Sequence, residues 1–167
     1  MTESATLLSP GAIRTITLVD FSIDEAQIEG TRTLTNLGFD AGGNVSFNRT
    51  VTGGKITFPN GKVATWEADH TLTQTAGGGT PFVWIDNDFE ITGGSSGINR
   101  NGKAFTVEIT QPLLKRAVCF WASAGEITLT VGDKTASIDY GDGDCDRKAI
   151  VTLPNGSTHE ILIRRWW

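Results

Sequence analysis

The feature that most constrains this chain is the alternation of apolar and polar residues between Asn-Gly turns. In the segment Lys103 to Thr110, Phe105, Val107 and Ile109 alternate with threonine and glutamate, and Glu126 to Val131 repeats the pattern. A period of two is that of a β-strand with one apolar and one polar face. No segment has the apolar spacing of an amphipathic helix, so we expect no substantial helix.

Turn signals divide the chain into hairpins. Asn-Gly occurs at Asn60-Gly61, Asn101-Gly102 and Asn155-Gly156, each time between two strand-like segments, and this is the strongest short-range hairpin signal. Residues 24–27 are where we expect a short helical turn. The pattern predicts an all-β fold, an antiparallel meander of about ten to twelve strands that closes into a barrel or folds into a sandwich.

The length of 167 residues fits a single domain. We assign residues 12–167 to one all-β domain and residues 1–11 to a leader that ends in a Ser-Pro-Gly turn and could cap an edge strand. The leader has no basic region and no long apolar run, so no signal peptide is visible in it. No apolar run is long enough to predict a transmembrane span.

The charge of the chain argues against one class of partner. The formal net charge is -5 and the basic residues are dispersed along the sequence. Binding to nucleic acid needs clustered lysine and arginine, so we expect no nucleic-acid partner.

The two cysteines, Cys119 and Cys145, allow one disulfide. In an exported protein an even count indicates a bridge, whereas in a reducing compartment both would be free thiols. We favour the disulfide.

An aspartate cluster lies just before the last hairpin. Asp142, Asp144 and Asp146 have the D-x-D-x-D spacing that can turn three carboxylates towards Ca²⁺. An EF-hand is excluded, because Arg147 and Leu153 stand where that loop needs glycine and a bidentate glutamate. We favour an acidic, solvated turn and keep calcium as the alternative; we expect no other cofactor.

Tryptophan beside acidic residues marks two further candidates. Trp84 is followed by Asp86 and Asp88, which we interpret as a strand-end turn, with a ligand-facing role as the alternative. Trp166 and Trp167 end the chain, and neighbouring residues of a strand face opposite ways, so one of them could dock on a partner or a sugar.

Catalytic motifs are weak. His70 and His159 are the only histidines and neither has metal-ligand spacing, and we find no nucleophile elbow and no phosphate-binding loop. A glycosidase needs only two suitably spaced carboxylates, and four acidic residues could supply a pair by chance: Glu67, Asp69, Glu90 and Glu108. We expect that the chain is not an enzyme.

Three longer motifs carry a resemblance. Ile28-Glu-Gly-Thr-Arg-Thr-Leu-Thr-Asn36, the segment from Thr92 to Lys103, and Asp139-Tyr-Gly-Asp-Gly-Asp-Cys-Asp146 are similar to those of a family of Bacteroidota exported lipoproteins with no assigned activity. The resemblance implies an all-β fold and a location at the cell surface or outside the cell, with Cys119 and Cys145 as family cysteines. Family members usually carry a signal peptide, a lipid-attachment cysteine and an upstream β-rich segment, which this sequence lacks.

These observations lead to one expectation of function and two alternatives. We expect a non-catalytic, exported cell-envelope domain with a structural or interaction role, whose partner is a second copy or another envelope protein. The alternative is a module that binds carbohydrate or another ligand through exposed tryptophan and acidic loops. A glycosidase-type enzyme is the third possibility.

Overall fold

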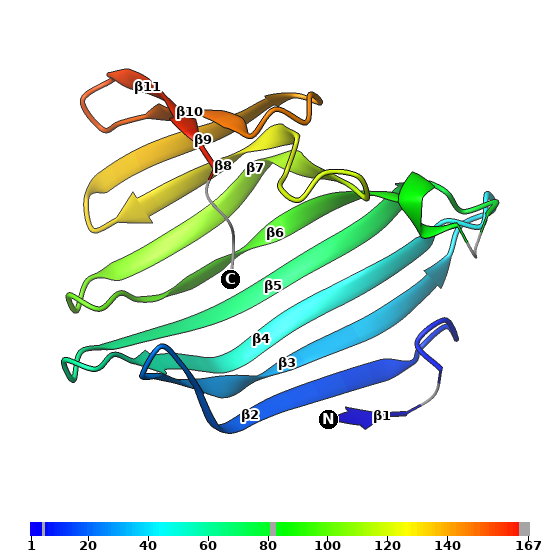
Figure 1. Cartoon of the computed structure of the whole chain (residues 1–167), viewed down its shortest axis with the longest axis horizontal. Helices are drawn as coiled ribbons and strands as arrows, with labels where there is room; N and C mark the ends of the chain where they lie inside the picture. Colours follow the sequence, from blue (N-terminus) through cyan, green and yellow to red (C-terminus); the bar gives the residue numbers. More distant parts are fainter. Residues whose placement is uncertain (5, 81–82, 164–167) are drawn as a thin grey trace.

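The computed structural model describes residues 1–4, 6–80 and 83–163, with only the backbone of Trp84. It consists of one 11-stranded sheet in which neighbouring strands are antiparallel and follow one another in sequence order (Figure 1). The predicted all-β meander is therefore confirmed. The strands are β1 (Thr2–Glu3), β2 (Ile13–Ile23), β3 (Ala26–Phe39), β4 (Val45–Thr57), β5 (Val63–Ala76), β6 (Asp88–Ile98), β7 (Ala104–Arg116), β8 (Ala124–Val131), β9 (Lys134–Asp142), β10 (Lys148–Thr152) and β11 (Thr158–Leu162), and one 3₁₀ turn, η1 (Trp84–Asp86), precedes β6.

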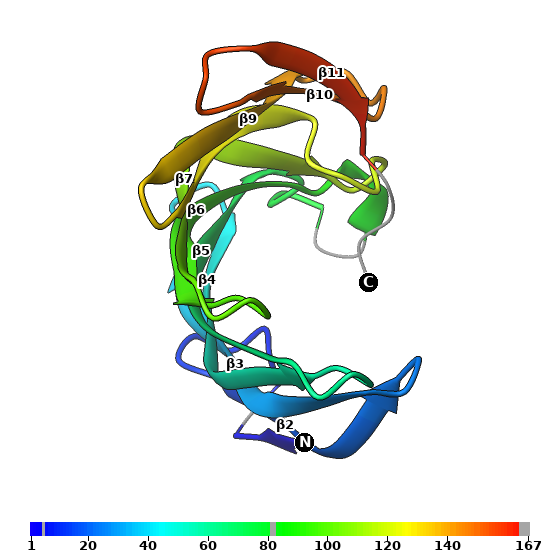
Figure 2. The same cartoon turned by 90° about the vertical axis from the view of Figure 1, so that its left-hand side faces the viewer.

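The sheet is open and strongly curved. Seen along its strands it has the outline of a C (Figure 2). The strand order begins at β1 and ends at β11 without pairing between them, so the sheet does not close into a barrel, and all strands of the described residues belong to this one sheet rather than to the two layers of a sandwich. Every strand pair from β2–β3 to β8–β9 contains a shift of register. Such bulges bend strands and increase their twist, which curls the sheet into a gutter.

The three Asn-Gly hairpins are confirmed and share one geometry. At the first, the amide of Phe58 donates to the carbonyl of Lys62 and the amide of Gly61 donates to the carbonyl of Phe58, both at 2.9 Å. In the second hairpin the amide of Asn99 donates to the carbonyl of Lys103 and that of Gly102 to the carbonyl of Asn99, and in the third Leu153, Ser157 and Gly156 form the same two bonds. Gly61, like the two equivalent glycines, has a left-handed φ, here +77°. These loops are three residues long, with glycine at the left-handed position that such loops require.

The expected helical turn at residues 24–27 is wrong. Ile23 pairs directly with Ala26, so Asp24 and Glu25 form a two-residue hairpin loop. Their φ angles are +48° and +64°. Positive φ at both central residues is the type I′ geometry, whose twist matches that of the flanking strands. Strand pairing on both sides therefore overrides the modest helical preference of this segment.

The two faces of the sheet differ in chemistry. On one face, residues that pair directly across neighbouring strands form rows that run across the sheet. One such row consists of Val51, Ala68, Ser95 and Val107. Trp121 packs against Tyr140 and Ala149, which the strand register places on this same face. It belongs to the loop between β7 and β8, and this loop lies on the inner side of the curved sheet (Figure 2), so the face is the concave one. The opposite, convex face carries threonine and acidic residues. We define the concave face of β3 to β7 by Arg32, Leu34, Phe47, Arg49, Val51, Trp66, Ala68, His70, Leu72, Ile91, Ser95, Phe105, Val107, Ile109 and Leu113.

The fully buried core is small. It is centred on Tyr140, Ala149 and Ile163, with Trp121 and Ile138 packed against them near the C-terminal end of the sheet. The accessible surface of the chain is 10519 Å², whereas a folded monomer of this mass exposes about 8,000 Å². About 2,500 Å² more surface is thus exposed than is usual for a folded monomer. A single curved layer explains this excess, because no second layer among the described residues covers its concave face.

The N-terminal segment lies on the outer edge of β2. Thr2 and Glu3 pair with Thr15 and Arg14, and the carboxylate of Glu3 lies 3.0 Å from the guanidinium of Arg14. Beyond Thr15, the described residues leave the outer edge of β2 unpaired. None of the helical segments described is long and apolar enough to cross a membrane.

Candidate functional site

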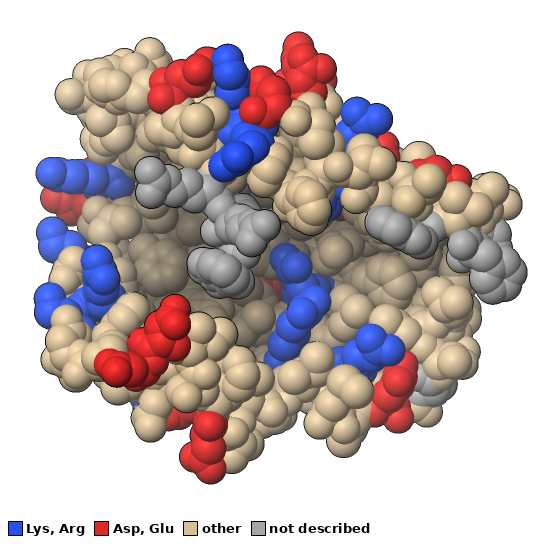
Figure 3. Space-filling view, in the orientation of Figure 1, with Lys and Arg blue, Asp and Glu red and all other residues tan. Residues whose placement is uncertain are grey.

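The curved sheet encloses a hollow on its concave side (Figure 2). Figure 3 views the sheet from its concave side and shows a hollow lined mostly by uncharged residues. Lysine or arginine side chains lie within it, and charged side chains of both signs stand around its rim. The hollow is therefore largely uncharged with a local positive charge, although the whole chain is acidic.

Two arginines and a histidine form the polar centre of the concave face. Leu34 pairs with Arg49 across β3 and β4, Arg32 pairs with Val51, and Arg49 pairs with His70 on β5. Arg32 and Arg49 are therefore diagonal neighbours on one face, a relation that places their Cβ atoms about 7 Å apart. We call Arg32, Arg49 and His70 the basic cluster.

The surroundings of the basic cluster disfavour its own charge. Burial, and secondarily the charge of Arg32, lower the pKa of the Arg49 guanidinium. Burial and then the charge of Arg49 lower the pKa of His70, against a smaller opposing effect of Asp69. The Nδ1 atom of His70 is buried and has no hydrogen-bond partner among the described residues. An anion placed here would relieve the repulsion and could accept hydrogen bonds from the guanidinium groups.

Two other basic residues of this face, Lys115 and Arg14, already have partners. The Nζ atom of Lys115 donates to the backbone carbonyl groups of Arg116 and Cys119, and burial lowers its pKa. Arg14 forms the ion pair with Glu3 described above. Arg32 and Arg49, in contrast, have no hydrogen bond or ion pair from their side chains among the described residues, so they retain the capacity to bind an anion.

The four acidic residues considered for glycoside hydrolysis lie on the convex face. They pair in register with convex residues: Asp69 with Gly94, Glu90 with Leu114, and Glu108 with Thr128. Asp69 accepts a hydrogen bond from Asn48 at 2.6 Å, and Glu67 accepts one from the amide of Gly53 at 2.8 Å. Both carboxylates thus hold neighbouring strands in register. Whether any pair of these acidic residues is catalytic stays untested.

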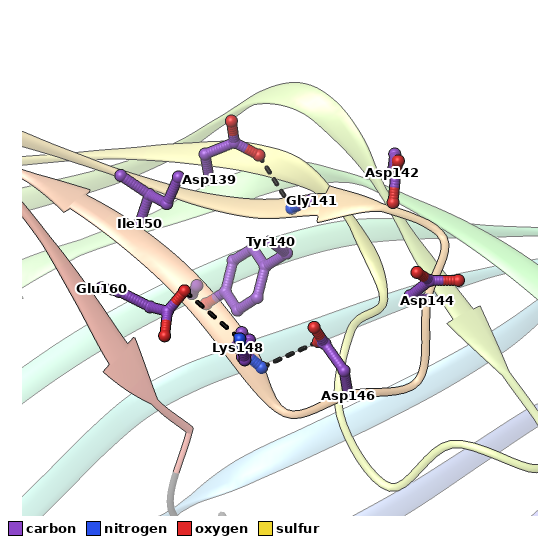
Figure 4. Close-up of a pocket in the computed structure, with 10 residues that line it drawn as sticks. Asp139, Tyr140, Gly141, Asp142, Asp144, Asp146, Lys148, Ile150 and Glu160 are labelled. Carbon is purple, nitrogen blue, oxygen red and sulfur yellow. Dashed lines mark hydrogen bonds and ion pairs between the residues drawn. The ribbon is translucent and has the colours of Figure 1, made fainter.

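The aspartate cluster begins with Asp142 at the end of β9 and continues with Asp144 and Asp146 on the loop to β10 (Figure 4). Asp142, Asp144 and Asp146 all line one shallow pocket, but their side chains are spread along the loop and do not converge on one point. The carboxylate of Asp146 accepts a hydrogen bond from the amide of Lys148 at 3.0 Å. In the described part of the chain, no three histidine, cysteine, aspartate or glutamate side chains are grouped to hold a metal ion. Calcium binding at this loop stays a prediction.

The disulfide between Cys119 and Cys145 is confirmed. Their Cα atoms lie 5.7 Å apart, a usual separation for a bridge. The bridge joins the loop after β7 to the aspartate-rich loop, and the amide of Gly143 donates to the carbonyl of Ser123 beside it. Arg147 then lies over the ring of Trp121 at 4.9 Å. The aspartate-rich loop is therefore tied to the core at its centre.

The remaining predicted site residues have structural partners or fall outside the described residues. Asp86 accepts a hydrogen bond from Thr80 at 2.6 Å, and Asp88 lies 3.7 Å from Arg116. These contacts fit the predicted turn at the end of a strand. The side chain of Trp84, together with Trp166 and Trp167, lies outside the described residues, so the ligand or interface role predicted for them stays a prediction.

Comparisons with known proteins add no assignment, because no family model, curated protein or solved structure matches the chain. The resemblance to exported lipoproteins of Bacteroidota accordingly stays a prediction.

Sequence reasoning missed the basic cluster. In the segment Thr31-Arg-Thr-Leu-Thr35, alternation places Arg32 on the same side as Leu34, which is an apolar position. Arg49 stands in the same relation to Phe47 and Val51. A charged residue at an inward position of an alternating strand is the signal that could have found the cluster.

Proposed function

We propose that this chain is a non-catalytic, exported domain of the cell envelope that acts by binding a partner on its concave face. The observation that carries the proposal is the uncovered apolar face of a single-layer sheet. The disulfide supports an oxidising, extracytoplasmic location, because such bridges persist there.

The size of the exposed surface supports a binding role. Soluble monomers rarely expose contiguous apolar patches of more than a few hundred Å². Here the whole chain, counted over both faces of the sheet, exposes about 2,500 Å² more than an ordinary monomer of its mass. A standard interface buries roughly 1,600 Å² on both partners together, so a single-layer sheet of this size offers enough surface for one.

The described tryptophans do not favour a sugar platform. The ring of Trp66 lies directly over Gly54, at the position that a side chain there would occupy, and Trp121 packs against the core. Stacking on a sugar needs an aromatic face that is free, so binding through the concave face is better supported than binding of carbohydrate by these two rings.

Self-association can use the edges of the sheet. Among the described residues, β11 pairs only with β10, and Leu162 on β11 is 62% exposed. Unpaired edges invite strand addition from another chain. Association through these edges would leave the hollow available to a different partner.

The proposal is tested by making the concave face polar without changing its shape. Val51→Thr with Val107→Thr replaces two methyl groups by hydroxyl groups and keeps β-branched residues in the strands. We expect the double variant to bind a hydrophobic fluorescent dye more weakly than the parent, at an unchanged far-UV circular dichroism spectrum.

The matched control removes one methyl group from each of two threonines on the convex face, as Thr50→Ser with Thr106→Ser. Dye binding should then stay at the level of the parent. Equal dye binding by parent and concave-face variant, or no dye binding by the folded parent, would contradict a role for this face. Size-exclusion chromatography with light scattering separates binding by a monomer from self-association.

A further inference from the structure

We infer that the basic cluster is a recognition site for an anionic amphiphile: a single carboxylate or comparable anion that carries an aliphatic chain. The inference rests on the proposed function, since it names the chemistry of the partner that the concave face takes. The anion would lie between Arg32 and Arg49, and the aliphatic chain along the apolar rows on either side.

The first support is the missing counterion. Within the described residues, ion pairs involve Arg14, Lys55, Arg116 and Lys148, and neither arginine of the basic cluster takes part in one. The acidic residues on the neighbouring strands point to the other face, where they are already bonded: Glu29 to Lys55, Glu67 to Gly53 and Asp69 to Asn48. The two positive charges therefore face the hollow together without a neutralising group of the described chain.

The second support is the apolar surround. Arg49 pairs with Leu34, and Arg32 is flanked in its row by Ile16 and Val51. One step further along the strands, Phe47 pairs with Leu72, which pairs with Ile91. A ligand that neutralises the arginines must therefore lie against aliphatic and aromatic side chains, which favours an apolar body next to its charge.

The third support separates an aliphatic chain from a peptide or a sugar. The backbone amide and carbonyl groups of these strands are paired within the sheet, and the side chains around the cluster are mostly apolar. A peptide or sugar laid on this surface would bury its own amide or hydroxyl groups without partners, which is unfavourable. An aliphatic chain has no such groups, so its only polar requirement is met by the arginines.

The experiment is isothermal titration of the full chain with dodecanoate kept below its micelle-forming concentration. Two matched ligands separate the components of binding, since dodecanol has the same chain without the charge and butyrate has the charge with a short chain. We expect dodecanoate to bind in a one-to-one complex, and both matched ligands to bind at least about 10-fold more weakly, because each lacks one of the two required parts.

Variants locate the site. Arg49→Gln and Arg32→Gln should each raise the dissociation constant for dodecanoate on the order of 10- to 100-fold, the usual effect of losing a hydrogen bond to a charged group. Arg49→Lys keeps the charge and should recover part of the affinity. Arg100→Gln, at the tip of the β6–β7 hairpin, is the matched control and should leave affinity within about 2-fold, since a distant exposed charge contributes little. Circular dichroism confirms that each variant is folded.

The outcomes distinguish this inference from the proposed function. Dodecanol that binds as tightly as dodecanoate, with no effect of the arginine variants, would overturn the anionic site and leave the concave face as a binding surface. Binding of an acidic peptide such as a glutamate decamer, with none of dodecanoate, would overturn the amphiphile and favour a protein partner. Absence of binding by all these probes, together with no dye binding, would overturn both.

Discussion

Breaking the bridge between Cys119 and Cys145 should reveal how strongly the C-terminal part of the sheet depends on it. The double variant Cys119→Ala with Cys145→Ala opens a loop that spans 26 residues and contains the β8–β9 hairpin. On the chain-entropy model, the loss of a bridge over a loop of this length lowers the free energy of unfolding by about 3.5 kcal/mol. For a chain of 167 residues, that loss corresponds to a fall in Tm of about 10 °C.

Alanine is the suitable replacement because Cys119 is only 1% exposed, and a serine there would bury a hydroxyl group. The assay is urea unfolding followed by tryptophan fluorescence, for the parent with and without dithiothreitol and for the double variant. Reduction of the parent should reproduce the loss seen in the variant, and dithiothreitol should leave the variant unchanged. A loss below about 1 kcal/mol in both would refute the reasoning, because the unfolded chain would then gain little freedom when the bridge is absent.

Three further outcomes follow from particular residues. Gly54→Ala should lower the free energy of unfolding by about 1–3 kcal/mol, because a Cβ atom there would lie 2.6 Å from the ring of Trp66. The control Gly79→Ala, where a Cβ atom has no neighbouring atom within 4 Å, should change it little. Equal unfolding midpoints of the two variants in urea would contradict this. Because the folded-state pKa of His70 is lowered, the unfolded chain binds more protons near pH 6, so stability should be full above the usual histidine pKa of about 6.5 and fall as the pH drops through it. Urea midpoints measured across this range should show a slope that His70→Gln reduces and His159→Gln retains. Deletion of residues 1–11 uncovers the edge of β2 at Ile13 to Thr15, so light scattering should detect more self-association than in the full chain, and a strict monomer at high concentration would count against this.

Local rules were enough to predict the strands and most of the turns. Asn-Gly, with glycine able to take a left-handed φ, marked all three hairpins that contain it, and alternation of period two marked β7 and β8. Asp24 and Glu25 were predicted incorrectly, because two residues with ordinary helical preference adopt positive φ only when the pairing of Ile23 with Ala26 requires it. That pairing is a tertiary constraint, and the local sequence does not contain it.

Whether the sheet closes could not be predicted from local sequence patterns either, because closure also depends on interactions between strands. Whether a long meander becomes a barrel, a sandwich or an open gutter depends on accumulated twist, and that twist depends on bulges such as the one between Leu18 and Phe21. A bulge adds one residue to one strand, and alternation then continues on the other side of it. The sequence pattern therefore predicts two strand segments but does not predict the bend that the bulge introduces between them.

Alternation of apolar and polar residues shows that one face of the sheet is apolar, but it does not show whether a second layer or a ligand covers that face. Here the basic cluster distinguishes the two cases. If a second layer of the same fold were meant to pack on the concave face, Arg32 and Arg49 would be fully buried without counterions, at a cost of several kcal/mol for each charge. Arg32 is exposed and Arg49 half-buried on this surface, so the two charges cost much less there and remain available to an incoming anion. Arg32 and Arg49 thus disfavour the packing of a second protein layer on this face and favour the binding of an anion. A ligand that is both apolar and anionic would contact the apolar side chains and neutralise the two arginines.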